Sequence, residues 1–183
     1  MILEGIVIAV GALLIWAAVS DYRSMLIPNW IPLSILGLFA AYQIAQGLMD
    51  ISSPAVPLVP SLIAGGVTFV VFTILFALNW IGGGDVKLIS AMAFWAGSFV
   101  GEFIIVMALV GGLVAVLFFF KQTHKPDSEV KIDVLAEART TNSPEKEEKE
   151  QKKGIKNTHI PYGIAISVAG LFVVNKIITI LPT

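Results

Sequence analysis

Six apolar runs of about 15 to 20 residues constrain this chain more than any other feature of its sequence. A helix needs roughly 20 mostly apolar residues to cross the hydrocarbon core of a bilayer, with about 17 to 25 tolerated. Five runs meet this length, whereas the fourth is short enough to suit a re-entrant segment or one tucked against its neighbours. The runs are approximately Ile2–Ser20, Ile31–Met49, Leu62–Ile81, Val86–Val100, Phe103–Phe120 and Tyr162–Leu181.

Charge is concentrated between the last two runs. Lys121–Ile160 holds nine basic and eight acidic residues, although the whole chain has only 12 basic and 13 acidic ones. A soluble domain is typically about 25% charged, against 14% here. This composition excludes a soluble globular protein and a basic nucleic-acid binder, and the lack of Cys excludes a disulfide scaffold. We predict an all-α polytopic membrane protein with about six transmembrane helices: five within 1–120, a partly disordered polar cytoplasmic loop at 121–160, and the sixth within 161–183.

The positions of the basic residues predict the orientation. With the amino terminus outside, the first, third and fifth connections face the cytoplasm and carry 11 of the 12 basic residues, including Arg23 and Lys87. The exception is Lys176, whose long stem lets it snorkel to the outer interface. We therefore expect a multi-pass protein of the cytoplasmic membrane, with the 121–160 loop inside the cell.

Two acids stand where acids are costly. Asp21 ends the first apolar run and Asp85 begins the fourth, so both are expected at the cytoplasmic face. Three glycines, Gly82–Gly84, precede Asp85. Because glycine carries no side chain and permits conformations that other residues avoid, a peptide can approach this carboxylate closely. Lys87 follows two positions later as a charge able to tune the site.

Two carboxylates within a few ångströms of each other cannot both ionise easily, so one stays protonated and the other ionised. Such a pair can hydrolyse a peptide: the ionised acid takes a proton from water, the water attacks the scissile carbonyl, and the protonated acid donates to the oxygen and later to the leaving amine. No metal or cofactor is needed. His124 and His159 lack the H-x-x-x-H spacing of a zinc site.

Three segments resemble the motifs of type IV prepilin peptidases. Asp21–Asn29 resembles their D-x5-I-P-N motif, Gly82–Leu88 their G-x-G-D-x-K-L motif, and Ile160–Ile166 their I-P-Y-G-x-A-I segment. The resemblance implies an intramembrane aspartyl protease of the G-x-G-D class that removes a short basic leader from pilin-like precursors on the cytoplasmic side. It implies that Asp21 and Asp85 are catalytic and that Gly82 and Gly84 form the loop presenting Asp85. The supporting residues it implies are Ile27, Pro28, Asn29, Lys87, Pro161, Tyr162 and Gly163.

The chain departs from the larger bacterial members of that family, which carry paired C-x-x-C motifs and also methylate the new amino terminus. Its lack of Cys therefore predicts cleavage without methyl transfer. The short members include Tad-type pilus peptidases and archaeal preflagellin peptidases. The expected partners are thus pilin-like or archaellin-like precursors and the lipid bilayer, with no nucleic acid, and the oligomeric state stays open.

Two other classes fit the apolar composition. A proton-coupled transporter also places acids at helix ends, but its binding acids are expected near the midplane and in repeated halves, and no repeat is visible here. A non-catalytic assembly protein would use the charged loop for docking. Four amide side chains within the apolar runs are expected to be interhelical hydrogen-bond partners and not substrate ligands. They are Gln43, Gln46, Asn79 and Asn175.

Overall fold

The computed structural model describes residues 2–24, 26–49, 54–123 and 162–181. Within these ranges the chain forms six α-helices, one short 3₁₀ helix and no strand, which confirms the all-α prediction for this part of the chain. Residues 121–123 of the predicted 121–160 loop are helical, whereas the rest of that loop, with His124 and His159, and Pro161 beyond it lie outside the described residues. The elements are α1 (Ile2–Ser24), α2 (Trp30–Leu48), α3 (Leu58–Ala77), α4 (Gly83–Ala96), η1 (Gly97–Phe99), α5 (Val100–Thr123) and α8 (Tyr162–Ile180).

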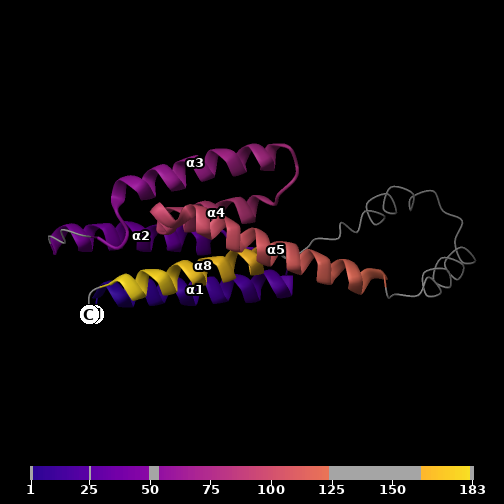
Figure 1. The fold of residues 1–183 in the computed structure, drawn as a ribbon, viewed down its shortest axis with the longest axis horizontal. Helices are drawn as coiled ribbons and strands as arrows, with labels where there is room; N and C mark the ends of the chain where they lie inside the picture. The colour runs from indigo at the N-terminus through magenta and orange to yellow at the C-terminus, as the bar shows by residue number, and fades with distance from the viewer. Residues whose placement is uncertain (1, 25, 50–53, 124–161, 182–183) are drawn as a thin grey trace, which may run out of the picture. The chain divides into compact units, whose positions relative to one another are not determined.

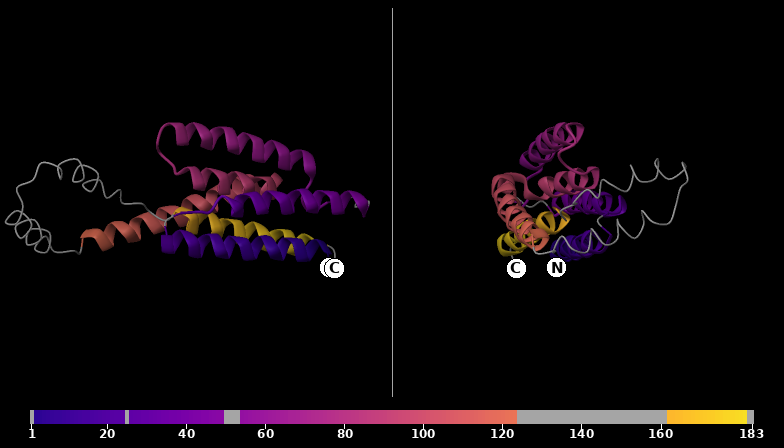
Figure 2. Two further views of the ribbon diagram at one scale, coloured as in Figure 1. Left: turned by 180° about the vertical axis from the view of Figure 1, so that it is seen from behind. Right: turned by 90° about the vertical axis from the view of Figure 1, so that its right-hand side faces the viewer.

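Five stretches of the described chain are long and apolar enough to cross a membrane, close to the predicted count of about six. Four of them are α1, α2, α3 and α8. The remaining stretch, Gly83–Leu117, contains both α4 and most of α5. Figures 1 and 2 show that the chain reverses direction between these two helices. The 14 residues of α4 extend only about 21 Å, less than the ~30 Å core of a bilayer.

A single glycine makes this reversal possible. Gly97, which follows α4, has a φ of +49°, a conformation that side-chain-bearing residues rarely adopt. A Cβ at this position would also stand 2.8 Å from Oγ of Ser61 on α3. The turn from α4 to α5 therefore requires glycine for its backbone conformation and for its close approach to α3.

The third helix begins and ends four residues earlier than the apolar run Leu62–Ile81 predicts. It begins early because Pro57 is its N-cap and Pro60 lies in the first turn, where a missing N–H breaks no helical bond. It ends early because Asn79 has a φ of +60°. The amides of Asn79 and Trp80 donate to the carbonyls of Phe76 and Leu75, which is a Schellman motif. Asn79 therefore terminates α3, and its role as an interhelical hydrogen-bond partner stays a prediction.

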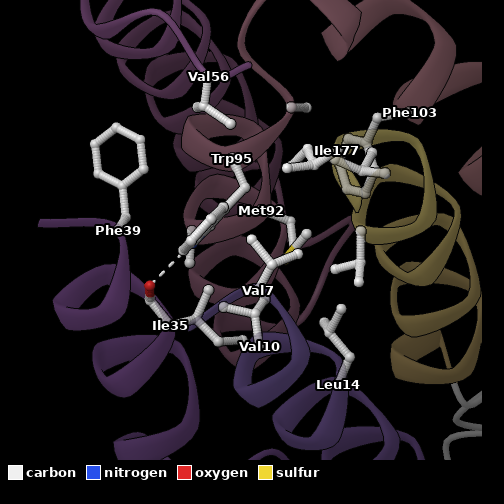
Figure 3. Packing of buried hydrophobic residues seen from close by; sticks show 14 of the residues in the cluster. Val7, Val10, Leu14, Ile35, Phe39, Val56, Met92, Trp95, Phe103 and Ile177 are labelled. Carbon is white, nitrogen blue, oxygen red and sulfur yellow. Dashed lines mark hydrogen bonds between the residues drawn. The ribbon is translucent and has the colours of Figure 1, made fainter. Parts of the chain in front are cut away.

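The short helix α4 lies at the centre of the bundle, in contact with α2, α3 and α8. Nine of its 14 residues are buried, including Trp95, whose indole N–H donates to the Ile35 carbonyl on α2 at 3.0 Å (Figure 3). Phe39 and Tyr42 of α2 pack against the Trp95 ring, with centroids 5.9 and 5.2 Å away. This aromatic contact holds α4 against α2, and so it helps to set the position of the first turn of α4 in the bundle.

The opposite end of the bundle holds a separate charged contact. Lys176 of α8 pairs with Glu102 of α5 at 2.5 Å, and its ammonium lies 4.1 Å from the ring centroid of Phe99. The lysine that was expected to snorkel toward an interface thus has a carboxylate and an aromatic face as partners. Glu102 is therefore a suitable site for a control substitution when Asp21 or Asp85 is replaced, because it lies at the other end of the bundle.

Candidate active site

All three motifs meet at one end of the helical bundle. Successive helices alternate in direction, which brings the end of α1 and the starts of α4 and α8 to the same end (Figures 1 and 2). Asp21 lies in the last turn of α1, Asp85 in the first turn of α4, and Gly163 in the first turn of α8. Residues far apart in the sequence are therefore neighbours in space.

Asp21 is buried beneath the start of α8. The residue is only 6% exposed, and the backbone N–H groups of Gly163 and Ile164 interact with its carboxylate. The first N–H groups of a helix have no partner inside the helix and carry partial positive charge, so they suit a carboxylate supplied by another helix. Oδ2 of Asp21 has no hydrogen-bond partner within the described residues.

Gly163 allows this contact because it has no side chain. A Cβ at this position would stand 2.7 Å from both Cγ and Oδ2 of Asp21 and 2.9 Å from its Cβ, distances that real Cβ atoms do not show. The contact with Asp21 therefore requires glycine at position 163 of the Ile-Pro-Tyr-Gly segment. The sequence placed Gly163 among the supporting residues without indicating what it would contact.

Asp85 is half-buried and occupies the third position of α4, where a negative charge is favoured by the helix dipole. It is close enough to Asp21 for the two carboxylates to repel each other. A Cβ on Gly82 would approach Oδ2 of Asp85 to 3.2 Å, and a Cβ on Gly84 would approach Cβ of Ile27 to 3.4 Å. The φ of Gly82 is −71°, and neither Gly82 nor Gly84 has a positive φ. The expected absence of a side chain near Asp85 therefore matters at Gly82, whereas the expected unusual backbone conformation is not observed.

A hydrogen bond joins the first motif to the second. The Lys87 ammonium donates to Oδ1 of Asn29 at 2.8 Å, in the connection between α1 and α2. Lys87 was expected to tune Asp85, but its partner is Asn29. The hydroxyl of Ser20, a residue that the motifs do not include, donates to the Leu26 carbonyl at 3.0 Å and closes the same connection from the other side. The Lys87–Asn29 and Ser20–Leu26 bonds hold the segment that leads from Asp21 to Ile27. Ile27 in turn packs on Gly84.

We expect Asn29 and Lys87 to act as one unit that positions the two motifs. In the cleavage reaction that the motif resemblance implies, Lys87→Ala and Asn29→Ala should each lower kcat/KM by roughly threefold to tenfold, the effect of one hydrogen bond. The double variant should be no worse than either single variant, because both remove the same bond. A double-mutant cycle on kcat/KM measures this coupling. Independent, multiplying losses would show that the two residues act separately.

An apolar cavity of about 290 Å³ opens beside Asp85. Its walls come from the end of α3 and from α4, α5 and α8, and its lining includes Trp80, Ile89, Gly112 and Tyr162. Gly111 and Gly112 of the fifth apolar run also line the cavity, and the three motifs do not include them. Within the described ranges no three His, Cys, Asp or Glu side chains gather to form a metal site.

The architecture is that of a polytopic helical membrane protein that holds two acids together at one end of its bundle. The model of the type IV leader peptidase family matches residues 8–120, more than half of the chain, and this range includes Asp21 and Asp85. The chain belongs to the type IV leader peptidase family. The Tyr162–Gly163 segment lies beyond the matched range. No curated protein and no solved structure matches this chain.

Proposed function

We propose that this protein is an aspartic-type endopeptidase that removes the leader from pilin-like or archaellin-like precursors, with Asp21 and Asp85 as its catalytic pair. The observation that carries the proposal is the meeting of these two acids at one end of the bundle, one under the α8 amides and one beside an apolar cavity. Family membership supports the reaction class.

The chemistry follows from the surroundings of each acid. We assign the ionised role to Asp21: burial disfavours its charge, but the backbone N–H groups of Gly163 and Ile164 face the carboxylate and stabilise its ionised form. Asp85, which faces the cavity, takes the protonated role. A water between them gives one proton to Asp21 as its oxygen attacks the scissile carbonyl, while Asp85 donates its proton to the carbonyl oxygen. Collapse of the tetrahedral intermediate then breaks the C–N bond, and the amine leaves with a proton from the pair.

The orientation and the product belong to the same proposal. The basic residues of the first and third connections, Arg23 and Lys87, favour a cytoplasmic location for the acids, because Lys and Arg are enriched on that side. The leader would then be cut inside the cell at the cytoplasmic membrane. Because the 183 residues contain no Cys, we propose that the new amino terminus is released without methylation.

The direct test is cleavage of a purified type IV pilin precursor by the purified protein in detergent. We expect the precursor to be cut once, between its basic leader and its apolar segment, and intact-mass analysis should show an unmodified new amino terminus. Glu102→Gln, at the other end of the bundle, is the matched acid control and should cut at the wild-type rate. An archaellin precursor in parallel shows which substrate is preferred. Wild-type protein that is folded and cuts neither precursor would refute the proposal.

A further inference from the structure

The cavity beside Asp85 has a polar end and an apolar body. Asp85 is its acidic lining residue, whereas Ile89 of α4 and Met107 of α5 contribute apolar walls deeper in the bundle. Tyr162, at the start of α8, also lines the cavity and is 42% exposed. A peptide whose carbonyl is attacked at Asp85 must therefore lie along the mouth of this cavity.

The volume limits what can enter. At about 290 Å³ the cavity lies near the lower end of the ~300–1,000 Å³ range of small-molecule pockets, so it has room for one or two side chains but not for a whole helix. Adjacent Cα atoms of a peptide are only about 3.8 Å apart. When the scissile carbonyl reaches the two acids, a residue next to the scissile bond therefore lies at the cavity.

We propose that this cavity is a specificity pocket that binds one large apolar side chain from the first residues after the scissile bond. The inference rests on the proposed function, since it takes Asp85 as the point of cleavage. The apolar lining excludes a charged side chain, because burying an unpaired charge there is costly. An aliphatic or aromatic side chain gains by leaving water and filling the space.

Gly112 sets the size of the pocket. It lines the cavity from α5, and a Cβ built on it meets nothing within 4 Å, so a larger residue would extend into open space without disturbing the backbone. Gly101, near the start of the same helix, is also exposed and a Cβ built on it also meets nothing within 4 Å, but it does not line the cavity. The two glycines form a matched pair for a substitution experiment.

The experiment compares Gly112→Leu with Gly101→Leu in detergent. The substrates are pilin precursors in which each of the first three residues after the cut is changed in turn to Ala, Leu, Trp or Lys. The wild type should prefer a large apolar residue at one of these positions and reject Lys there. Gly112→Leu should lower kcat/KM for the large residue by roughly tenfold or more. It should leave the Ala precursor within about twofold, so that the preference shifts to the smaller side chain. Gly101→Leu should keep the wild-type preference.

Two results would overturn the pocket. One is equal effects of the two Leu variants across all precursors, with matching thermal unfolding, which would mean that the cavity holds lipid or nothing during catalysis. The other is a wild type that cuts Lys and Leu precursors equally well at all three positions. In both cases Asp85→Asn would still abolish cleavage, so the proposed function would stand without the pocket. Failure of the proposed function is distinct, because the wild type would then cut no precursor.

Discussion

Asp21→Asn and Asp85→Asn should each abolish precursor cleavage, lowering kcat by about 10³-fold or more. General acid–base catalysis by one positioned group contributes about 10²–10⁴-fold to the rate. Because the two acids act as one unit, replacing either of them removes the contribution of both. Asn has the shape of Asp and its carbonyl still accepts a hydrogen bond, so the amides of Gly163 and Ile164 keep a partner at Asp21. Both variants should therefore fold as the wild type does. Single-turnover cleavage followed on a gel measures the loss.

The wild-type rate should depend on pH as a bell. At low pH the ionised acid takes up a proton and can no longer accept one from water, and at high pH the protonated acid loses the proton that it must donate. The two apparent pKa values belong to the pair and not to either residue. The control, Glu102→Gln, should show the same bell and the same rate. Full activity in either Asn variant, or a rate that is constant through the acidic range, would contradict the paired-acid mechanism.

The sequence predicted the helices well where hydrophobicity alone decides. The apolar runs of α1, α2 and α8 agree with the structure within a few residues, because a long and mostly apolar segment gains by forming a helix in an apolar environment. The ends of α3 were misplaced because local backbone chemistry overrides hydropathy there. Pro57 and Pro60 are compatible with a helix start, and the apolar neighbours of Asn79 conceal a left-handed residue that ends the helix.

Tertiary contacts at the candidate site could not be derived from the motifs. The sequence identified Asp21, Asp85 and Lys87, but it carried no information on which helix start would face Asp21 or which oxygen would accept from Lys87. Both depend on the packing of α8 on α1 and of α4 on α2, which many side chains decide together. For the same reason α4, short and buried nearly all round, has no polar face that could predict its orientation.

Gly163→Ala tests the most specific of these contacts. One added methyl would stand 2.7 Å from Cγ and Oδ2 of Asp21, so either α8 or the carboxylate must move. A displacement of about 1 Å in a catalytic group can cost roughly a hundredfold in rate. We expect kcat to fall by about tenfold to a hundredfold while KM changes little, because the precursor still reaches the cavity beside Asp85.

The matched control for this variant is Gly37→Ala on α2, where an added Cβ meets nothing within 4 Å. Ala is preferred over Gly inside a helix by about 1 kcal/mol, so this control should be as stable as the wild type or slightly more stable, with unchanged kcat. Thermal unfolding in detergent, measured beside kcat and KM, separates a misplaced carboxylate from a damaged bundle. A folded Gly163→Ala protein with wild-type kcat would show that the start of α8 does not position Asp21. A rise in KM alone would mean instead that this helix start contacts the precursor.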